Sequence, residues 1–193
     1  MGKSKPLAFI DIETTGLSIE EGHEIIEIAI LKGDISYYVK VTPQHIERAN
    51  PKALEINKYN PTRWFGAISP RKAANETAQI LQGCRIVAHN PSFDMGFLRD
   101  LWDLHNIECY VDYRYIDTIV LSHEHLESIG CRSLSLDNIR RFMGWSRLGS
   151  HTALADVEDT RRLYNTLCRA TVFHRLYWWG RWGLLCWLGS NDG

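Results

Sequence analysis

The sequence predicts an α/β domain built on a mixed β-sheet, and three observations indicate this class. Short apolar segments with strand character occur early in the chain and are separated by short turns. Later apolar segments alternate with stretches of helical periodicity, as in proteins whose parallel strands are joined by helices. With 193 residues, the chain is long enough for one domain with a sizeable core. We therefore expect one sheet that holds both antiparallel and parallel strands.

The first half of the chain is expected to supply three strands and two helices. Residues 6–12 are almost all apolar, which is typical of a central strand that is covered on both faces. Two further strands are expected near 24–32 and 35–41. Short helices are expected near 51–57 and 70–82.

The second half is expected to begin with a strand at 85–89 and a helix at 91–104. Asn90 is a suitable N-cap for this helix, and Pro91 is a suitable first helical residue. Four apolar residues recur at helical spacing and predict the stripe that faces the core, namely Phe93, Phe97, Leu101 and Leu104. The remaining predicted elements are a short strand near 113–117, helices near 118–127 and 134–143, and a long helix from 152 to about 168 or beyond.

Two acidic residues stand at the end of the first predicted strand. Because side chains alternate along a strand, Asp11 and Glu13 leave it on the same side. Gly16, in the turn that follows, would let backbone amides approach a ligand closely. Taken alone, this segment also fits a strand end with two solvated acids before a turn.

Two other segments carry candidate residues at helix starts. Asp94 is expected in the first turn of the helix at 91–104, where an acid can also serve only to compensate the helix dipole. Asp156 is expected in the first turns of the last helix, for which Thr152 is a suitable N-cap. Residues five apart on one helix lie on different faces. Placing His151 in the preceding loop instead lets His151 and Asp156 converge, although a lone histidine there also fits a surface residue.

Together these four carboxylates and one histidine are what a two-metal phosphodiesterase needs. Hard oxygen ligands bind divalent cations, and a pair of cations can stabilise both the attacking and the leaving oxygen of a phosphoryl displacement. A histidine can accept the proton of the attacking water near neutral pH.

The three segments also carry a family resemblance. DIETTGL, NPSFDMGFL and HTALAD occur in this order, each at a strand end or a helix start. From about residue 7 to 168, the chain resembles the DEDDh branch of the DEDD-type 3′–5′ exonucleases. This branch includes the proofreading subunit of bacterial DNA polymerase III, the oligoribonucleases and RNase T. The resemblance implies an RNase H-like fold, with a five-stranded mixed sheet flanked by helices on both faces.

The resemblance further implies roles for the residues of the site. Asp11, Glu13, Asp94 and Asp156 would hold two Mg²⁺ or Mn²⁺ ions, and His151 would be the general base. The substrate-binding residues would be those of the first turn and two on or before the helix at 91–104, namely Thr14, Thr15, Gly16, Leu17, Asn90 and Phe97. Leu17 and Phe97 would contact the terminal base, and Asn90 would either contact a phosphate or only cap its helix.

The expected reaction is the removal of nucleoside 5′-monophosphates from the 3′ end of single-stranded DNA. DIETTGL is closer to the proofreading and phage-type DNA exonucleases. No motif reads the 2′-hydroxyl that separates RNA from DNA, so RNA trimming of the RNase T or oligoribonuclease kind is the alternative. A non-catalytic binding module would lack at least one of the five catalytic residues, and all five are present.

Charge is distributed unevenly along a chain whose net charge is −1. Residues 132–181 hold nine arginines, no lysine and four acids, a balance of +5. Arginine makes forked contacts with phosphate, so this half is a candidate track for the backbone of a strand. The other interpretation is a set of solvated helix faces that carry Arg140, Arg141, Arg161 and Arg162.

Several other polar residues are candidates for the site. His123 and His125 lie two apart on a predicted helix, so they face apart and indicate solvent exposure rather than a metal site. Glu27 lies in an apolar strand, as either a buried paired acid near the site or an edge-facing residue. Asp117 is expected to support the site or the fold, and His89 to be structural.

The remaining features concern compartment and domain limits. Five scattered cysteines without a CxxC pair, and a start without a signal-peptide core, predict a cytoplasmic protein. We expect the exonuclease domain at 1–172 and a Trp-rich tail at 173–193. The uncharged part of the tail is too short to span a membrane. The tail would pack on its own domain, form a surface for a polymerase or for self-association, or stack on bases or a membrane surface.

Overall fold

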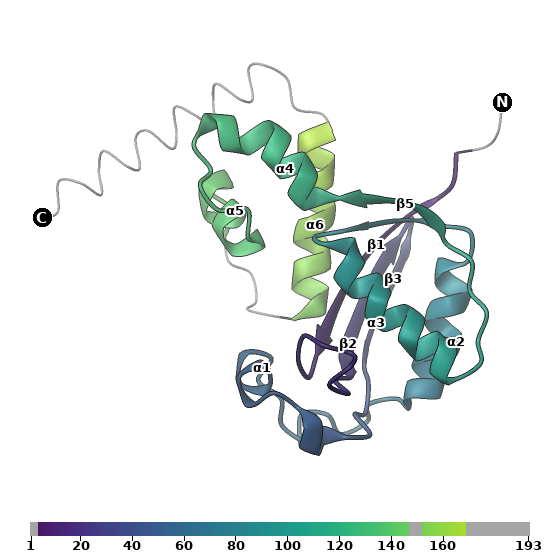
Figure 1. Ribbon diagram of the computed structural model, residues 1–193. Coiled ribbons are helices and arrows are strands. Elements are labelled where there is room, and N and C mark those ends of the chain that lie inside the picture. The colour runs from purple at the N-terminus through teal and green to yellow at the C-terminus, as the bar shows by residue number, and fades with distance from the viewer. Residues whose placement is uncertain (1–3, 147–151, 169–193) are drawn as a thin grey trace, which may run out of the picture.

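The computed structural model describes residues 4–146 and 152–168, and its centre is a five-stranded sheet (Figure 1). The strands lie in the order β3-β2-β1-β4-β5. Their bounds are β1 Leu7–Thr14, β2 Ile25–Lys32, β3 Ile35–Lys40, β4 Arg85–Ala88 and β5 Asp112–Asp117. The pairs β1–β2 and β2–β3 are antiparallel, whereas β1–β4 and β4–β5 are parallel. The predicted mixed sheet is therefore confirmed.

The helices also match the sequence-based expectations: every expected element begins within two residues of its predicted start, and those before α6 also end within two residues of their predicted ends. The α-helices are α1 Pro51–Ile56, α2 Pro70–Leu81, α3 Pro91–Leu104, α4 Thr118–Leu126, α5 Leu136–Met143 and α6 Ala153–Cys168. Two short 3₁₀ helices are η1 Ile46–Arg48 and η2 Glu127–Ile129. β1 continues two residues beyond its expected end at 12, so Glu13 lies within the strand and not after it.

Helices cover both faces of the sheet. On one face, Ala8 and Ile10 of β1 share a buried cluster with residues of α2 and α3. On the other face, Phe9 of β1 packs with Ala153 and Val157 of α6. Successive side chains of a strand point to opposite faces, which is why β1 is apolar at almost every position. The central strand thus places alternate residues, Asp11 and Glu13 included, on the side covered by α6.

A second group of helices lies beside α6 and away from the sheet (Figure 1). Ile139 and Phe142 of α5 and Leu126 of α4 form a buried cluster with Leu163 and Leu167 of α6. This packing fixes α5 against α6, and it therefore determines which α5 side chains reach the first turns of α6. None of the helices in the described ranges 4–146 and 152–168 is long and apolar enough to cross a membrane.

Two expectations about α3 are wrong. Asn90 does not cap the helix with its side chain, because its backbone is left-handed (φ 79°, ψ 63°) and not extended as at a side-chain N-cap. Its backbone N–H instead donates to Asp117 Oδ1 at 3.2 Å. Leu104 does not join the core stripe, because it is the last residue of the helix and is 69% exposed.

Candidate active site

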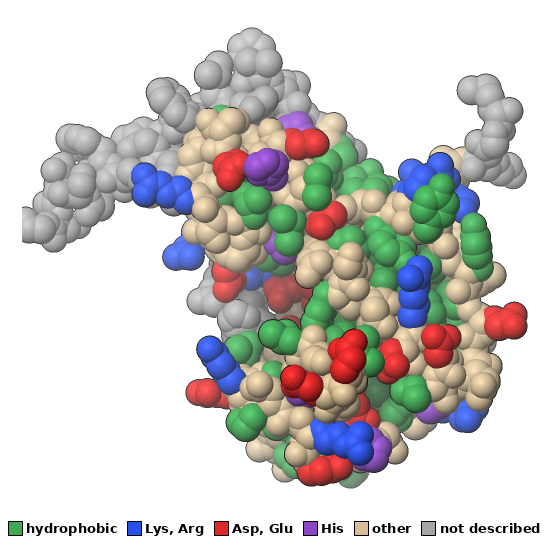
Figure 2. Space-filling view, in the orientation of Figure 1, with side chains coloured by type: hydrophobic (Ala, Val, Ile, Leu, Met, Phe, Trp, Pro, Cys, Tyr) green, Lys and Arg blue, Asp and Glu red, His purple; other side chains and the backbone are tan. Residues whose placement is uncertain are grey.

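Three carboxylates from distant parts of the chain meet beside the sheet. Asp11 and Glu13 come from β1, and Asp156 comes from the first turn of α6. Each offers an oxygen atom that lies within 4.8 Å of the other two. In Figure 2, acidic side chains are set back between the part of the surface formed by α4 and α5 and the part below it. Carboxylate oxygens at this spacing suit Mg²⁺ or Mn²⁺, which prefer hard oxygen ligands.

Asp94 lies next to this group but is held differently. It is 4% exposed, and its Oδ1 accepts the backbone N–H of Ile12 at 3.1 Å. Ile12 stands between Asp11 and Glu13, so α3 is bound to β1 at the point where the two acids emerge. After burial, which is the larger cause, the charge of Asp94 raises the pKa of Asp11. The structure thus brings Asp94 to the site, while its expected role as a metal ligand stays a prediction.

The electrostatics of the site favour protonation or the binding of cations. Burial raises the pKa of Asp11 well above its usual range, and the charges of Asp94, Asp156 and Glu13 add to the effect. Burial, followed by the charges of Asp156 and Glu27, raises the pKa of Glu13 to about 8. Burial also raises the pKa of Asp94 to about 8, against hydrogen bonds from backbone N–H groups. Crowded, desolvated carboxylates of this kind are typical of metal sites and of acid–base sites.

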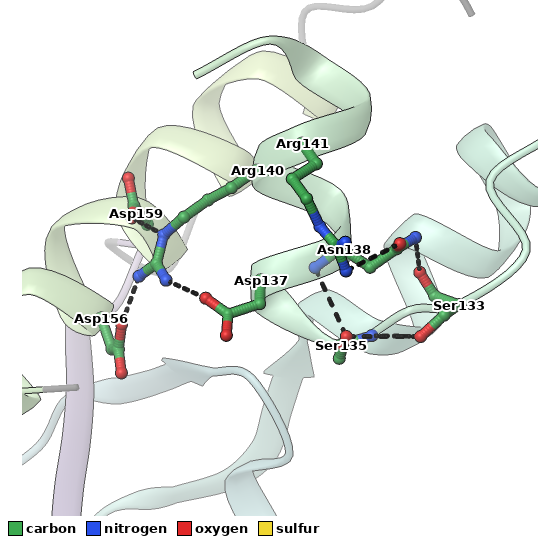
Figure 3. Close-up of polar contacts among 8 residues, drawn as sticks. All are labelled: Ser133, Ser135, Asp137, Asn138, Arg140, Arg141, Asp156 and Asp159. Carbon is green, nitrogen blue, oxygen red and sulfur yellow. Dashed lines mark hydrogen bonds and ion pairs between the residues drawn. The ribbon is translucent and has the colours of Figure 1, made fainter. Parts of the chain in front are cut away.

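Arg140 of α5 reaches the site through its contact with Asp156 of α6 (Figure 3). Its guanidinium donates to Asp156 and Asp159 of α6 and, at 2.7 Å, to Asp137 of α5. Arg140 is 5% exposed, so it belongs neither to a solvated helix face nor to a track open to phosphate, and both interpretations are wrong for this residue. Sequence reasoning missed this role, although the spacing of Asp156 and Asp159 on one helix face was a signal for a shared partner.

The other arginines of this region are differently placed. Arg141 is exposed and donates to Asn138 Oδ1 at 3.4 Å. Arg162 is exposed, and its guanidinium carbon Cζ lies 4.3 Å from the ring centroid of Trp145. For these two residues, both the phosphate track and the solvated helix face remain open.

Glu27 is a buried, paired acid, so the first of its two expected positions is confirmed and the edge-facing one is wrong. It is the register partner of Glu13 across β1 and β2. Its carboxylate accepts the backbone N–H of Ala153 at 3.3 Å and a hydrogen bond from the Tyr38 hydroxyl. Burial raises the pKa of Glu27. Glu27 therefore joins the first residue of α6 to the strand next to Glu13, which helps to set the position of Asp156.

The turn after β1 is largely buried, with one exception. Thr14 and Thr15 are 6% and 1% exposed, and the Thr14 hydroxyl donates to the carbonyl of Gly16. A Cβ at Gly16 would lie 2.4 Å from the His23 imidazole, so a glycine is needed here to make room for His23, and the approach of the backbone amides to a ligand stays a prediction. Leu17 is 83% exposed. Of the four residues expected here at the substrate, Leu17 alone presents an exposed side chain.

The two remaining substrate candidates lie near α3. Phe97 is 4% exposed and packs against Phe93, with ring centroids 5.0 Å apart. Its ring is thus part of the core, as its helical spacing also predicted, and its contact with a base stays a prediction. Asn90 is exposed and has the left-handed backbone described above, so its contact with a phosphate also stays a prediction.

The expected supporting roles are confirmed for two residues. His89 Nε2–H donates to the carbonyl of Leu134 at 2.8 Å, and its Nδ1 lies 2.9 Å from the Thr118 hydroxyl. Asp117 caps α4 by accepting the N–H of Ile119. The exposed His123 pairs with Glu127 and lies outside the carboxylate group. Three predictions, namely the general base His151, the domain limit at 172 and the tail at 173–193, lie outside the described residues.

Comparisons with known proteins agree with this geometry. The family model RNase_T, described as an exonuclease, matches residues 8–164. The chain is 32% identical over 160 residues to a PolC-type DNA polymerase III of Thermotoga maritima, a match that covers 80% of this chain and 11% of that protein. It is 27% identical over 205 residues to Ribonuclease T of Shewanella oneidensis, a match that covers 95% of this chain and 88% of that protein.

A solved structure shares the fold. The crystal structure of Escherichia coli Exonuclease I in complex with a dT13 oligonucleotide superposes with a TM-score of 0.71 at 16% identity. The match covers 90% of this chain and 43% of that chain. At this identity the likeness concerns the fold, and it confirms the RNase H-like class expected from the sequence.

Proposed function

The chain belongs to the RNase_T exonuclease family, and on this premise we propose that it is a metal-dependent 3′–5′ exonuclease. The observation that carries the proposal is the convergence of Asp11, Glu13 and Asp156, with Asp94 hydrogen-bonded to the backbone between the first two. The chain spans 11% of the PolC-type relatives, so the activity is argued from the site and not from those longer proteins.

The residues of the site fit a divalent cation. They are oxygen donors, and they are close together. Burial, and after it the charges of neighbouring carboxylates, raises the pKa values of Asp11, Glu13 and Asp94, and the charge of Arg140 offsets this only in part at Asp11. We propose that Asp11, Glu13, Asp94 and Asp156 hold two Mg²⁺ or Mn²⁺ ions. When bound, such ions supply the charge that stabilises the attacking and leaving oxygens of a phosphodiester.

The protein's own residues would supply orientation and proton transfer. His151 precedes α6 by two residues, and we propose it as the general base, since an imidazole accepts protons near neutral pH. Glu27, through its bond to Ala153, fixes the start of α6, and Asp94 fixes α3 to β1. These two bonds hold the elements that carry the acids, so a substrate would meet a pre-arranged site.

The proposed substrate is the 3′ end of single-stranded DNA, which would release nucleoside 5′-monophosphates. The exposed Leu17, four residues after Glu13 in the sequence, offers an apolar surface for the terminal base. The direction of attack rests on the resemblance of the three motifs to DEDDh 3′–5′ exonucleases. RNA is the second candidate. It is favoured by the relative named Ribonuclease T, whose alignment covers 95% of this chain. A polymerase partner or self-association through residues 173–193 stays a prediction.

The test is degradation of DNA and RNA strands of the same sequence, each labelled at either the 5′ or the 3′ end. With Mg²⁺ or Mn²⁺, we expect 5′-labelled DNA to give a descending ladder and 3′-labelled DNA to release labelled mononucleotide at once. EDTA or Asp11→Asn should abolish both. Asp34→Asn, the same change at an exposed turn, is the matched control. Faster loss of RNA would favour the second candidate, and cleavage of a circular single strand would contradict the exonuclease.

A further inference from the structure

We propose that Arg140 is a positioning residue of the metal site, whose guanidinium holds the Asp156 carboxylate in the orientation that faces Asp11 and Glu13. This inference rests on the proposed metal site and adds a residue to it. Arg140 lies on α5, away from the sheet, and would contact neither the metal nor the substrate. It would act on the site only through Asp156.

The geometry around Arg140 fixes the direction of its side chain. Three of its nitrogens each have their own carboxylate, with Nη2 on Asp156, Nε on Asp159 and Nη1 on Asp137. The side chain is 6% exposed, so water competes little for these bonds. Because the guanidinium is planar and its donors point in fixed directions, three such partners leave it little freedom to rotate.

Asp156 connects this cluster to the three-carboxylate group. Its Oδ1 accepts a hydrogen bond from Arg140 Nη2, and the same carboxylate offers an oxygen within 4.8 Å of those of Asp11 and Glu13. A carboxylate bound on one side to a rigid donor cannot turn freely about its last bond. Carboxylates that bind metals are commonly oriented by outer hydrogen bonds in this way, and loss of the outer partner typically weakens metal binding about 10–100-fold.

The orientation that Arg140 gives to Asp156 and the positive charge of Arg140 would change metal affinity in opposite directions, and this makes the inference testable. A cation beside a metal ligand repels the incoming metal, so removal of its charge alone would strengthen metal binding. Loss of the fixed orientation would weaken it. Arg140→Lys separates the two effects, because it keeps the positive charge but replaces the planar fork by a compact ammonium that cannot reproduce three directed bonds.

The experiment measures Mn²⁺ binding to the full-length chain by calorimetry, for the wild type, Arg140→Lys and Arg141→Lys. Arg141 is the neighbouring arginine, it is exposed, and its guanidinium bonds to Asn138 and to none of the described carboxylates of the site. The same substitution there is therefore the matched control. We expect Arg140→Lys to bind Mn²⁺ about tenfold more weakly than the wild type, and Arg141→Lys to bind as the wild type does.

Thermal melting in EDTA shows that the chains are folded, and binding is measured well below every transition. If Arg140 only linked α5 to α6, Arg140→Lys would have a lower melting temperature but the Mn²⁺ affinity of the wild type. That result would overturn the role of Arg140 and leave the proposed metal site intact. Equal weakening in Arg141→Lys would also overturn that role. Failure of the wild type to bind Mn²⁺ would overturn the proposed metal site, and with it the role of Arg140.

Discussion

Replacing Glu13 by glutamine should stabilise the metal-free protein at alkaline pH, although it removes an expected metal ligand. Burial and the neighbouring acids raise the pKa of Glu13 from 4.5 to about 8. Between these two values the folded chain keeps a proton that the unfolded chain has released. Because the folded state binds more protons there, the free energy of unfolding decreases as the pH rises through this interval.

The size of the effect follows from the same two pKa values. At about 1.4 kcal/mol per pKa unit, the interval from 4.5 to about 8 corresponds to a destabilisation of at most about 5 kcal/mol once Glu13 is fully ionised. Glutamine resembles the protonated acid and does not ionise. We therefore expect Glu13→Gln to gain about 3–4 kcal/mol relative to the wild type between pH 5 and pH 8.

The assay is urea denaturation in EDTA at pH 5 and at pH 8, with Glu55→Gln on α1 as the same substitution at an exposed position. Addition of Mg²⁺ at pH 8 should stabilise the wild type and stabilise Glu13→Gln much less, since a ligand is missing. A difference between the wild type and Glu13→Gln that is the same at both pH values would refute the electrostatic reasoning.

Three further predictions concern the surroundings of the site. Gly16→Ala should destabilise the fold by about 1–3 kcal/mol in urea denaturation, because its Cβ would lie 2.4 Å from the buried His23 ring. Leu17→Ala should leave the melting temperature unchanged but raise KM for single strands several-fold in initial-rate measurements, since Leu17 is exposed and is proposed to contact the terminal base. An unchanged KM would remove it from the substrate site. His89→Ala should cost about 1–3 kcal/mol of stability, because two partly buried hydrogen bonds are lost, while the same change at the exposed His123 should cost little.

The sequence predicts the parts of the site that depend on local periodicity. Asp11 and Glu13 are two residues apart on a strand, so their common side follows from the alternation of side chains. Asp156 lies in the first turn of a helix whose start is visible in the sequence, and this turn is where the structure places it. The positions of the strands and helices along the chain follow in the same way, because the local spacing of apolar residues indicates each of them.

The parts that sequence reasoning missed depend on contacts between distant segments. Glu27 and Ala153 are 126 residues apart, and no local pattern indicates that they are bonded. Arg140 looked like one basic residue among several, because its burial results from the packing of α5 on α6. The contact of the His23 ring with Gly16 is likewise absent from any local pattern, because it depends on how the turn folds back on itself.

The most direct test of the metal-dependent exonuclease follows strand hydrolysis and metal binding in the same Mn²⁺ titration. A 5′-labelled single strand reports the rate of shortening from the 3′ end, and calorimetry reports occupancy of the chain by Mn²⁺. We predict that the rate rises with occupancy, and that Asp11→Asn loses both hydrolysis and most of the binding while its fold is retained. Full hydrolysis by the metal-free wild type, or by Asp11→Asn, would contradict the account.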